Sequence, residues 1–164
     1  MEMKPLLSDI EIKALNTFGL FELTASHTYM HLANRMKSLG YFGMEAFFKN
    51  ESDDERLHYL KLEQFMNDMN CELEVPSLDP VKSDITNVES ALVMAYDMEL
   101  TLLNLYEKVY SSEVSGKVKV VLQEFITIQT GAVGEYGDLI NRLKLTDNML
   151  VFDADMLERS ENEG

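Results

Sequence analysis

Near the middle of a long helical pattern stands the stretch Glu51-Ser52-Asp53-Asp54-Glu55-Arg56-Leu57-His58-Tyr59-Leu60. In an α-helix, residues three apart lie on one face about a turn apart, so Glu55 and His58 can bind the same metal ion. The same face continues through apolar residues, namely Met44, Phe47, Phe48, Leu62, Phe65 and Met69. The pair therefore faces a core, where a carboxylate needs a partner, a raised pKa or a cation.

The helical pattern around this pair runs from about Tyr41 to Asn70. Before it, Ser8-Asp9-Ile10-Glu11 reads as a capping box, in which the first and last side chains satisfy free amides at the start of a helix. That helix ends near Gly40. After the central pattern, Cys71–Ser83 contains two of the three prolines and has no helical period, which predicts an extended crossover.

Two long helical patterns and a short one follow the crossover. Thr86-Asn87-Val88-Glu89 reads as a second capping box, and Ser115-Gly116 separates the third helix from the fourth. Thr146–Asn148 then breaks the pattern before a short fifth helix at Val151–Glu161. Two helices, a long connection and two more helices predict an all-α fold, a four-helix bundle with one crossover.

Polar residues also interrupt the apolar stripes of the remaining three long helices. The first helix carries Glu22 and Tyr29 on its stripe, the third carries Glu99, and the fourth carries Gln129. With Glu55 and His58 they form a set that is rich in oxygen and contains one imidazole. Such ligands suit iron or manganese, and the absence of a thiolate cluster argues against structural zinc. The competing interpretation is a fortuitous set of buried polar residues in an inert bundle.

Bulk properties limit the remaining classes. A chain of 164 residues can bury a core without disulfides, so we expect one domain over residues 1–164. The single cysteine excludes an intrachain disulfide and fits a reducing compartment. There is no signal-peptide pattern and no apolar run of about 18 residues, so we expect a cytoplasmic protein without a membrane partner. The net charge of −15 argues against a nucleic-acid partner and favours attraction of cations.

In the order of these motifs the sequence resembles the ferritins over nearly its whole length. The resemblance rests on Phe21-Glu22-Leu23, Tyr29, Asp54-Glu55-Arg56-Leu57-His58, Glu99, Gln129, Ala132 and Gly137-Asp138. It implies a bundle of ferritin-like topology with a di-iron centre, in which Glu22 and His58 bind one iron and Glu55 bridges. Glu99 would then hold the second iron, Gln129 would be a weak or neighbouring ligand, and Tyr29 a nearby hydrogen-bonding or redox-active phenol. Glu51 could supply a further iron site or could be a solvated surface residue.

The resemblance also implies a function. It points to a ferroxidase that oxidises Fe(II) with dioxygen or peroxide and stores the product as mineral in a homo-oligomeric cage of twenty-four subunits (a 24-mer). Gln129 and Ala132 stand where bacterioferritins carry a second Glu-x-x-His, and Arg56 where they carry a haem-ligating methionine, so we expect no haem.

Some positions depart from the ferritin pattern. Lys119 and Leu122 stand at expected pore positions, and Leu57 and Leu60 fall in the usual acidic patch of the cavity. These departures keep open a di-iron oxidase or peroxidase that stores nothing, and a catalytically inert cage subunit. His27 and His31 read as surface or interface histidines.

Overall fold

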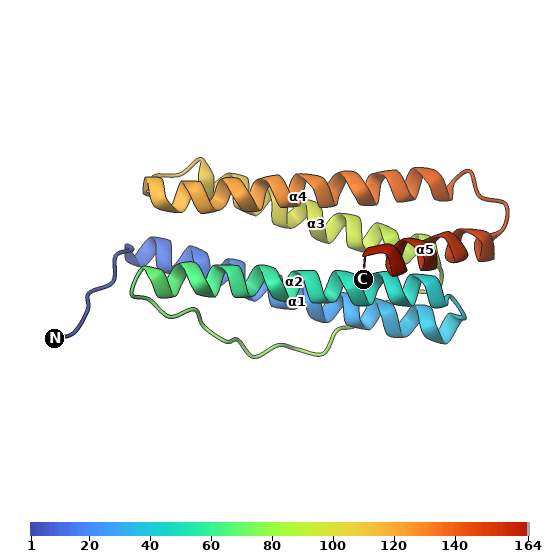
Figure 1. Ribbon diagram of the computed structural model, residues 1–164, viewed down its shortest axis with the longest axis horizontal. Coiled ribbons are helices and arrows are strands. Elements are labelled where there is room, and N and C mark those ends of the chain that lie inside the picture. Colours follow the sequence, from blue (N-terminus) through green and yellow to red (C-terminus); the bar gives the residue numbers. More distant parts are fainter. Residues whose placement is uncertain (164) are drawn as a thin grey trace.

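The computed structural model describes residues 1–163, and its secondary structure is helical throughout this range apart from loops and turns. The helices are α1 (Asp9–Leu39), α2 (Phe42–Asp68), α3 (Val88–Tyr110), α4 (Gly116–Leu143) and α5 (Met149–Glu163). Figure 1 shows α1 beside α2 and α3 beside α4, as two hairpins that pack into one bundle. The predicted four-helix bundle with a short fifth helix is confirmed. No helix within residues 1–163 is both long and apolar enough to cross a membrane.

The helix ends follow the capping signals, with one correction. Ser8 and Glu11 form the predicted capping box at the start of α1, and Gly40 ends that helix with a φ of 90°. The start of α3 was predicted at Thr86, but Asn87 is the N-cap and pairs reciprocally with Ser90. Both side chains can cap a helix, and the Asn87 oxygen, 2.7 Å from the Ser90 amide, makes the cap one residue later. Glu89 stays exposed.

The ends of α2 and α5 differ slightly from expectation. Helix α2 begins at Phe42 and ends at Asp68, so it is shorter at both ends than the predicted 41–70. Helix α5 extends from Met149 to Glu163, beyond the predicted 151–161 on both sides. Its earlier start coincides with Asn148, whose side-chain oxygen accepts from the Leu150 amide at 3.0 Å.

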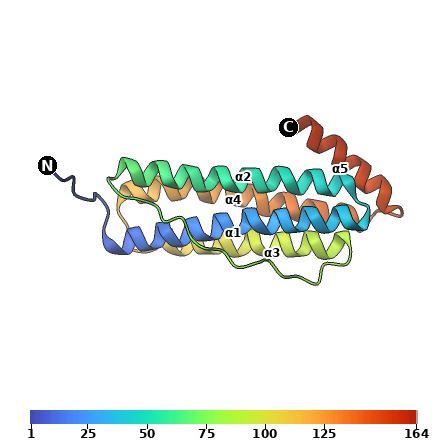
Figure 2. The ribbon, with the colours of Figure 1, turned by 90° about the horizontal axis from the view of Figure 1, so that it is seen from below.

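The crossover between α2 and α3 is extended and runs along the first hairpin for most of its length (Figures 1 and 2). Leu73 and Ile85 are its buried anchors near the two ends. The Tyr59 hydroxyl donates to the Glu74 carbonyl at 2.8 Å, and the Arg35 guanidinium donates to the Ile85 carbonyl at 2.9 Å. These bonds satisfy backbone groups that an extended segment leaves free, which holds the crossover against the bundle.

The apolar core consists of two clusters, one on each side of a polar band. The cluster near α5 includes Tyr29, Phe48, Leu92, Tyr136 and Phe152. The cluster at the opposite end includes Leu15, Phe18, Leu62, Tyr106 and Phe125. Tyr29 belongs to the cluster near α5, and the other predicted polar interruptions of the stripes lie between the two clusters, so their side chains point into the bundle and not into solvent.

Helix α5 diverges from the bundle axis and closes the end of the bundle where α2 begins (Figure 2). Asp153 is buried and accepts hydrogen bonds from the backbone amides of Gly43 at 3.0 Å and Met44 at 2.8 Å. It thereby satisfies amides at the N-terminus of α2 from a different helix. The approach requires glycine, because a Cβ at Gly43 would lie 1.8 Å from the Asp153 carbonyl oxygen.

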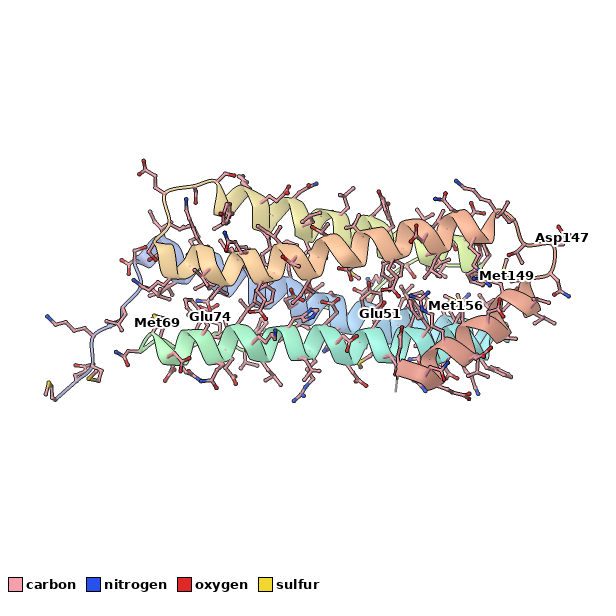
Figure 3. The ribbon with its side chains drawn as sticks, turned by 45° about the horizontal axis from the view of Figure 1, so that its top comes forward. Glu51, Met69, Glu74, Asp147, Met149 and Met156 are labelled. Atoms are coloured by element: carbon pink, nitrogen blue, oxygen red, sulfur yellow. The ribbon has the colours of Figure 1, made fainter. Side chains whose placement is uncertain are left out.

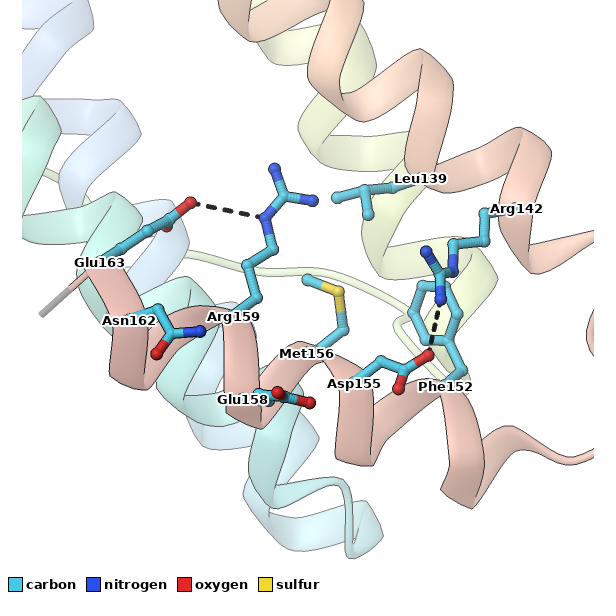
Figure 4. Close-up of a pocket in the computed structure, with 9 residues that line it drawn as sticks. All are labelled: Leu139, Arg142, Phe152, Asp155, Met156, Glu158, Arg159, Asn162 and Glu163. Carbon is cyan, nitrogen blue, oxygen red and sulfur yellow. Dashed lines mark hydrogen bonds and ion pairs between the residues drawn. The ribbon is translucent and has the colours of Figure 1, made fainter.

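Ion pairs also connect α5 to α4 across a groove, and Figure 4 shows one of them, between Arg142 and Asp155. Arg142 pairs with Asp155 at 2.7 Å, and Arg159 pairs with Glu135 of α4 at 2.6 Å. Arg159 also lies 3.5 Å from Glu163 of its own helix. The apolar floor of the groove includes Leu139, Phe152 and Met156. The fifth helix is therefore fixed to both hairpins.

Candidate metal centre

Each of the four long helices contributes a polar side chain to the band at mid-height. Glu22 comes from α1, Glu55 and His58 from α2, Glu99 from α3 and Gln129 from α4. Their exposed fractions are 0% for Glu22, 3% for Glu55 and 1% each for Glu99 and Gln129. Such burial is costly for carboxylates unless partners or a cation compensate it. The structure therefore brings together residues that the sequence pattern predicted to converge.

Glu22, Glu55 and His58 form the half of the centre best suited to hold an ion. His58 Nδ1 lies 3.2 Å from Glu55 Oε2 and 3.5 Å from Glu22 Oε2, and one potential ligand atom from each residue lies within 4.8 Å of the others. Within the described residues, Glu22 Oε2 is buried and has no hydrogen-bond partner. Because buried polar atoms are almost always satisfied, this free oxygen fits a bound cation.

Glu99 forms the other half and is held by two neighbours. The Tyr29 hydroxyl donates to Glu99 Oε1, and the Gln129 amide nitrogen donates to Glu99 Oε2. The same nitrogen also donates to the Glu99 carbonyl oxygen at 2.9 Å. Gln129 and Tyr29 thus fix the orientation of this carboxylate, and both are fully or almost fully buried.

The electrostatics show carboxylates competing for protons. Burial raises the pKa of Glu55 well above its usual range, and the adjacent Glu22 carboxyl group and the charge of Glu99 raise it further. Burial also raises the pKa of Glu99, against the hydrogen bond from Tyr29. Burial opposes ionisation of Glu22, but the close approach of the Glu55 carboxyl group and the His58 imidazole outweighs burial and lowers the Glu22 pKa. Without a cation, protons thus take over part of the charge compensation that a metal would provide.

His58 completes this electrostatic balance. Burial by itself lowers the pKa of an imidazole, but the nearby Glu22 carboxylate and its charge outweigh burial and raise the His58 pKa. A metal ion would have to displace protons from the cluster, so binding there releases protons.

Glu51 lies one turn before Glu55 and is set apart from the three-residue group. Figure 3 labels it on α2, and the Tyr136 hydroxyl of α4 donates to Glu51 Oε1 at 3.0 Å. Tyr136 stacks on Tyr29, with ring centroids 6.1 Å apart. Burial raises the pKa of Glu51 to about 8, and the charge of Glu135 adds to the shift. Glu51 is therefore linked to the centre through a pair of tyrosines.

The two histidines of α1 lie outside the centre. His27 is exposed, and His31 Nε2 lies 2.6 Å from the Ser83 hydroxyl of the crossover. Neither belongs to the group formed by Glu22, Glu55 and His58.

One neighbour of the centre was not recognised in the sequence. The Tyr106 hydroxyl donates to Glu22 Oε1, and Tyr106 is fully buried. In the sequence, Tyr106 falls at helical spacing from apolar residues of the third helix, such as Leu102 and Val109, which by itself indicates a core residue. Its position seven residues after Glu99 puts the two on one face, and a buried tyrosine hydroxyl usually has a hydrogen-bond partner. Together, these two observations could have indicated from the sequence that Tyr106 lies beside the centre.

The fold and the site together define a helical bundle with a carboxylate and histidine centre. The family model described as a ferritin-like domain matches residues 12–146. The chain therefore belongs to the ferritin family.

Individual relatives agree with this assignment. Ferritin BfrB of Mycolicibacterium smegmatis is 32% identical over 81 residues, which cover 49% of this chain and 45% of the relative. The soma ferritin of Lymnaea stagnalis is 26% identical over 149 residues, covering 85% of this chain and 86% of the relative. A ferritin of Pacifastacus leniusculus is also 26% identical, with 84% and 82% covered.

Solved structures agree in fold. A structure described as a novel open pore ferritin from the hyperthermophilic archaeon Archaeoglobus fulgidus superimposes with a TM-score of 0.85 at 17% identity. The superposition covers 92% of this chain and 97% of the archaeal chain. At this identity the likeness establishes the ferritin fold.

Proposed function

We propose that this protein is a ferroxidase that oxidises Fe(II) at an intrasubunit di-iron centre and stores the product as mineral in a cage. The observation that carries the proposal is the cluster of Glu22, Glu55 and His58, with one buried carboxylate oxygen left without a partner. Oxygen ligands with one imidazole suit iron, and the cluster lies beside a further buried carboxylate, Glu99.

The residues divide between two iron positions. Glu22 and His58 would hold one Fe(II), Glu55 would bridge, and Glu99 would hold the second. Gln129 and Tyr29 would orient Glu99 through the hydrogen bonds described above. Three carboxylates do not fully neutralise two divalent ions, so hydroxide or oxide would complete the charge.

The proposed reaction balances with iron as substrate. Two Fe(II) ions each give one electron to dioxygen, which takes up two protons and becomes hydrogen peroxide. With hydrogen peroxide as the oxidant, two electrons and two protons yield two water molecules. The protons that leave Glu55 and His58 when iron binds are close to where the oxidant is reduced.

Storage requires a cage, which we propose to be a homo-oligomer of twenty-four subunits in the cytoplasm, without haem. The formal charge of −15 per chain would draw Fe(II) toward such a shell.

A di-iron oxidase or peroxidase without storage is the second candidate. It is favoured by Leu57, which is 55% exposed on α2 where the ferritin pattern places an acid for mineral nucleation. A catalytically inert cage subunit is the third.

Stopped-flow absorbance after aerobic addition of two Fe(II) per subunit tests the oxidation. We expect rapid Fe(III) formation in the wild type and its loss in Glu55→Ala. Asp53→Ala is the matched control, because Asp53 is an exposed acid on the same helix. Equally slow oxidation in the wild type and Glu55→Ala would refute the ferroxidase.

Native mass and iron content separate the remaining candidates. A large assembly that retains iron supports storage, and fast oxidation without retained iron supports the second candidate. An assembly without fast oxidation supports the inert subunit.

A further inference from the structure

We propose that Tyr106 is a positioning residue that holds the Glu22 carboxylate ready for the metal, an inference that rests on the proposed function. Glu22 has no exposed surface, and its oxygens differ in their surroundings. Oε1 accepts the Tyr106 hydroxyl, whereas Oε2 has no hydrogen-bond partner among the described residues and lies 3.5 Å from His58 Nδ1. The phenol thus occupies one oxygen and leaves the other for the ion.

Tyr106 is well placed to act as a rigid support. Its ring packs against Phe18 with centroids 4.7 Å apart and against Phe125 with centroids 5.4 Å apart. These partners come from α1 and α4, while Tyr106 comes from α3. A ring packed between two helices has little rotational freedom, so its hydroxyl presents a fixed donor.

Phe125, which packs against Tyr106, also contacts His58, the second proposed ligand of the iron that Glu22 would hold. Phe125 meets the His58 ring edge-on, with centroids 6.2 Å apart and an interplanar angle of 81°. Glu22 is thus oriented by a hydrogen bond to Tyr106, and His58 by contact with Phe125. The two side chains come from different helices, so their relative placement depends on this packing.

The physical consequence concerns the cost of binding. A glutamate has three rotatable side-chain bonds. Fixing them costs conformational entropy, which reduces the binding free energy of the metal ion unless the protein already holds the side chain in place. Removing a hydrogen bond to a metal-ligating side chain typically weakens metal binding by about 10–100-fold. Tyr106→Phe removes the hydroxyl and keeps the ring, so we expect a loss of affinity within that range.

Co²⁺ titration of the assembled protein tests the proposal without depending on iron oxidation. The d–d absorbance of Co²⁺ gives the affinity and reports the coordination geometry. We expect Tyr106→Phe to bind the first Co²⁺ about 10–100-fold more weakly, with an altered spectrum and an unchanged assembly mass. Tyr59→Phe is the control, because its hydroxyl bonds the Glu74 carbonyl and no carboxylate of the centre. It should bind Co²⁺ like the wild type.

A double-mutant cycle shows whether Tyr106 acts through Glu22. In a Glu22→Ala background, Tyr106→Phe should cause no further loss of Co²⁺ affinity, because its partner is already absent. An additional loss there of the same size as in the wild type would overturn the positioning role.

The outcomes also separate this inference from the proposed function. If the wild type and Tyr106→Phe bind Co²⁺ equally well, the positioning role fails while the metal centre stands. If the wild type binds no Co²⁺ and oxidises no Fe(II), both proposals fail.

Discussion

Replacing Glu11 by glutamine should destabilise the protein at neutral pH by removing a carboxylate that joins two helix ends. Glu11 lies in the first turn of α1, is 5% exposed, and accepts from the Ser8 amide at 3.0 Å. Its other oxygen accepts from the Ser115 amide at 2.8 Å and the Ser115 hydroxyl at 2.6 Å, just before α4. In Glu11→Gln, one carboxylate oxygen becomes an NH₂ group that faces donors, so at least one of these bonds is lost.

The size of the effect follows from the pKa of Glu11. Burial opposes its ionisation, but hydrogen bonds from Ser115 and Ser8 outweigh burial and lower the pKa from 4.5 to about 2. Each pKa unit corresponds to about 1.4 kcal/mol, so the upper limit at pH 7 is about 3.4 kcal/mol. Solvent near the helix ends screens part of this, which leaves about 2 kcal/mol. For a chain of this length, that lowers Tm by roughly 4–8 °C.

Scanning calorimetry of both proteins from pH 7 down to pH 2 measures the effect and its sign. A lowered carboxylate pKa stabilises the fold fully above the unfolded value of 4.5, and the stabilisation is lost as pH falls toward about 2. The Tm difference should therefore be largest at pH 7 and vanish near pH 2. Glu89→Gln, an exposed acid in the first turn of α3, should cost less than about 1 kcal/mol. A Tm difference that is independent of pH would refute the electrostatic reasoning.

Three further perturbations test other parts of the structure. Gly43→Ala should lower Tm strongly, because its Cβ would lie 1.8 Å from the Asp153 carbonyl oxygen, whereas Gly131→Ala, with open space around it, should be neutral or slightly stabilising. Asp153→Ala should cost about 1–3 kcal/mol in thermal unfolding, because two amides of α2 lose their acceptor. Glu51→Gln should raise the Tm of metal-free protein at pH 9 and leave it unchanged at pH 4, because the folded pKa of about 8 makes the fold lose stability as pH rises from 4.5 to 8; equal Tm values at both pH values would contradict this.

The fold was predictable because its local signals agree with one another. The 3.6-residue periodicity, the Ser8 cap, Gly40 and the prolines of the crossover all indicate the same helices. The convergence of Glu22, Glu55, His58 and Glu99 was predictable for the same reason, since each interrupts an apolar stripe. Their roles as iron ligands stay a prediction.

Other features depend on contacts between distant residues and have no local signal. The bonds from Ser115 to Glu11 join positions 104 residues apart, and Asp153 accepts from the amide of Gly43 in α2, 110 residues earlier. The spacing from Glu99 places Tyr106 on the face of the centre, but only the folded structure shows that its hydroxyl reaches Glu22 on α1. The exact start of α3 was missed because Thr86 and Asn87 are adjacent and both favour the N-cap.

The long crossover has a consequence for the order of folding. Helices α1 and α2 pack mainly on each other, as do α3 and α4, so each hairpin can form from contacts close in sequence before the two halves meet. Glu22 and Glu55 belong to the first hairpin and Glu99 to the second, so docking brings like charges together in a dry interface. We expect this docking step to be slowed by ionised carboxylates and accelerated by divalent cations. Association of the two hairpins around these carboxylates would then be the slow, last step of folding, and binding of the same ions that the centre is proposed to hold would accelerate it.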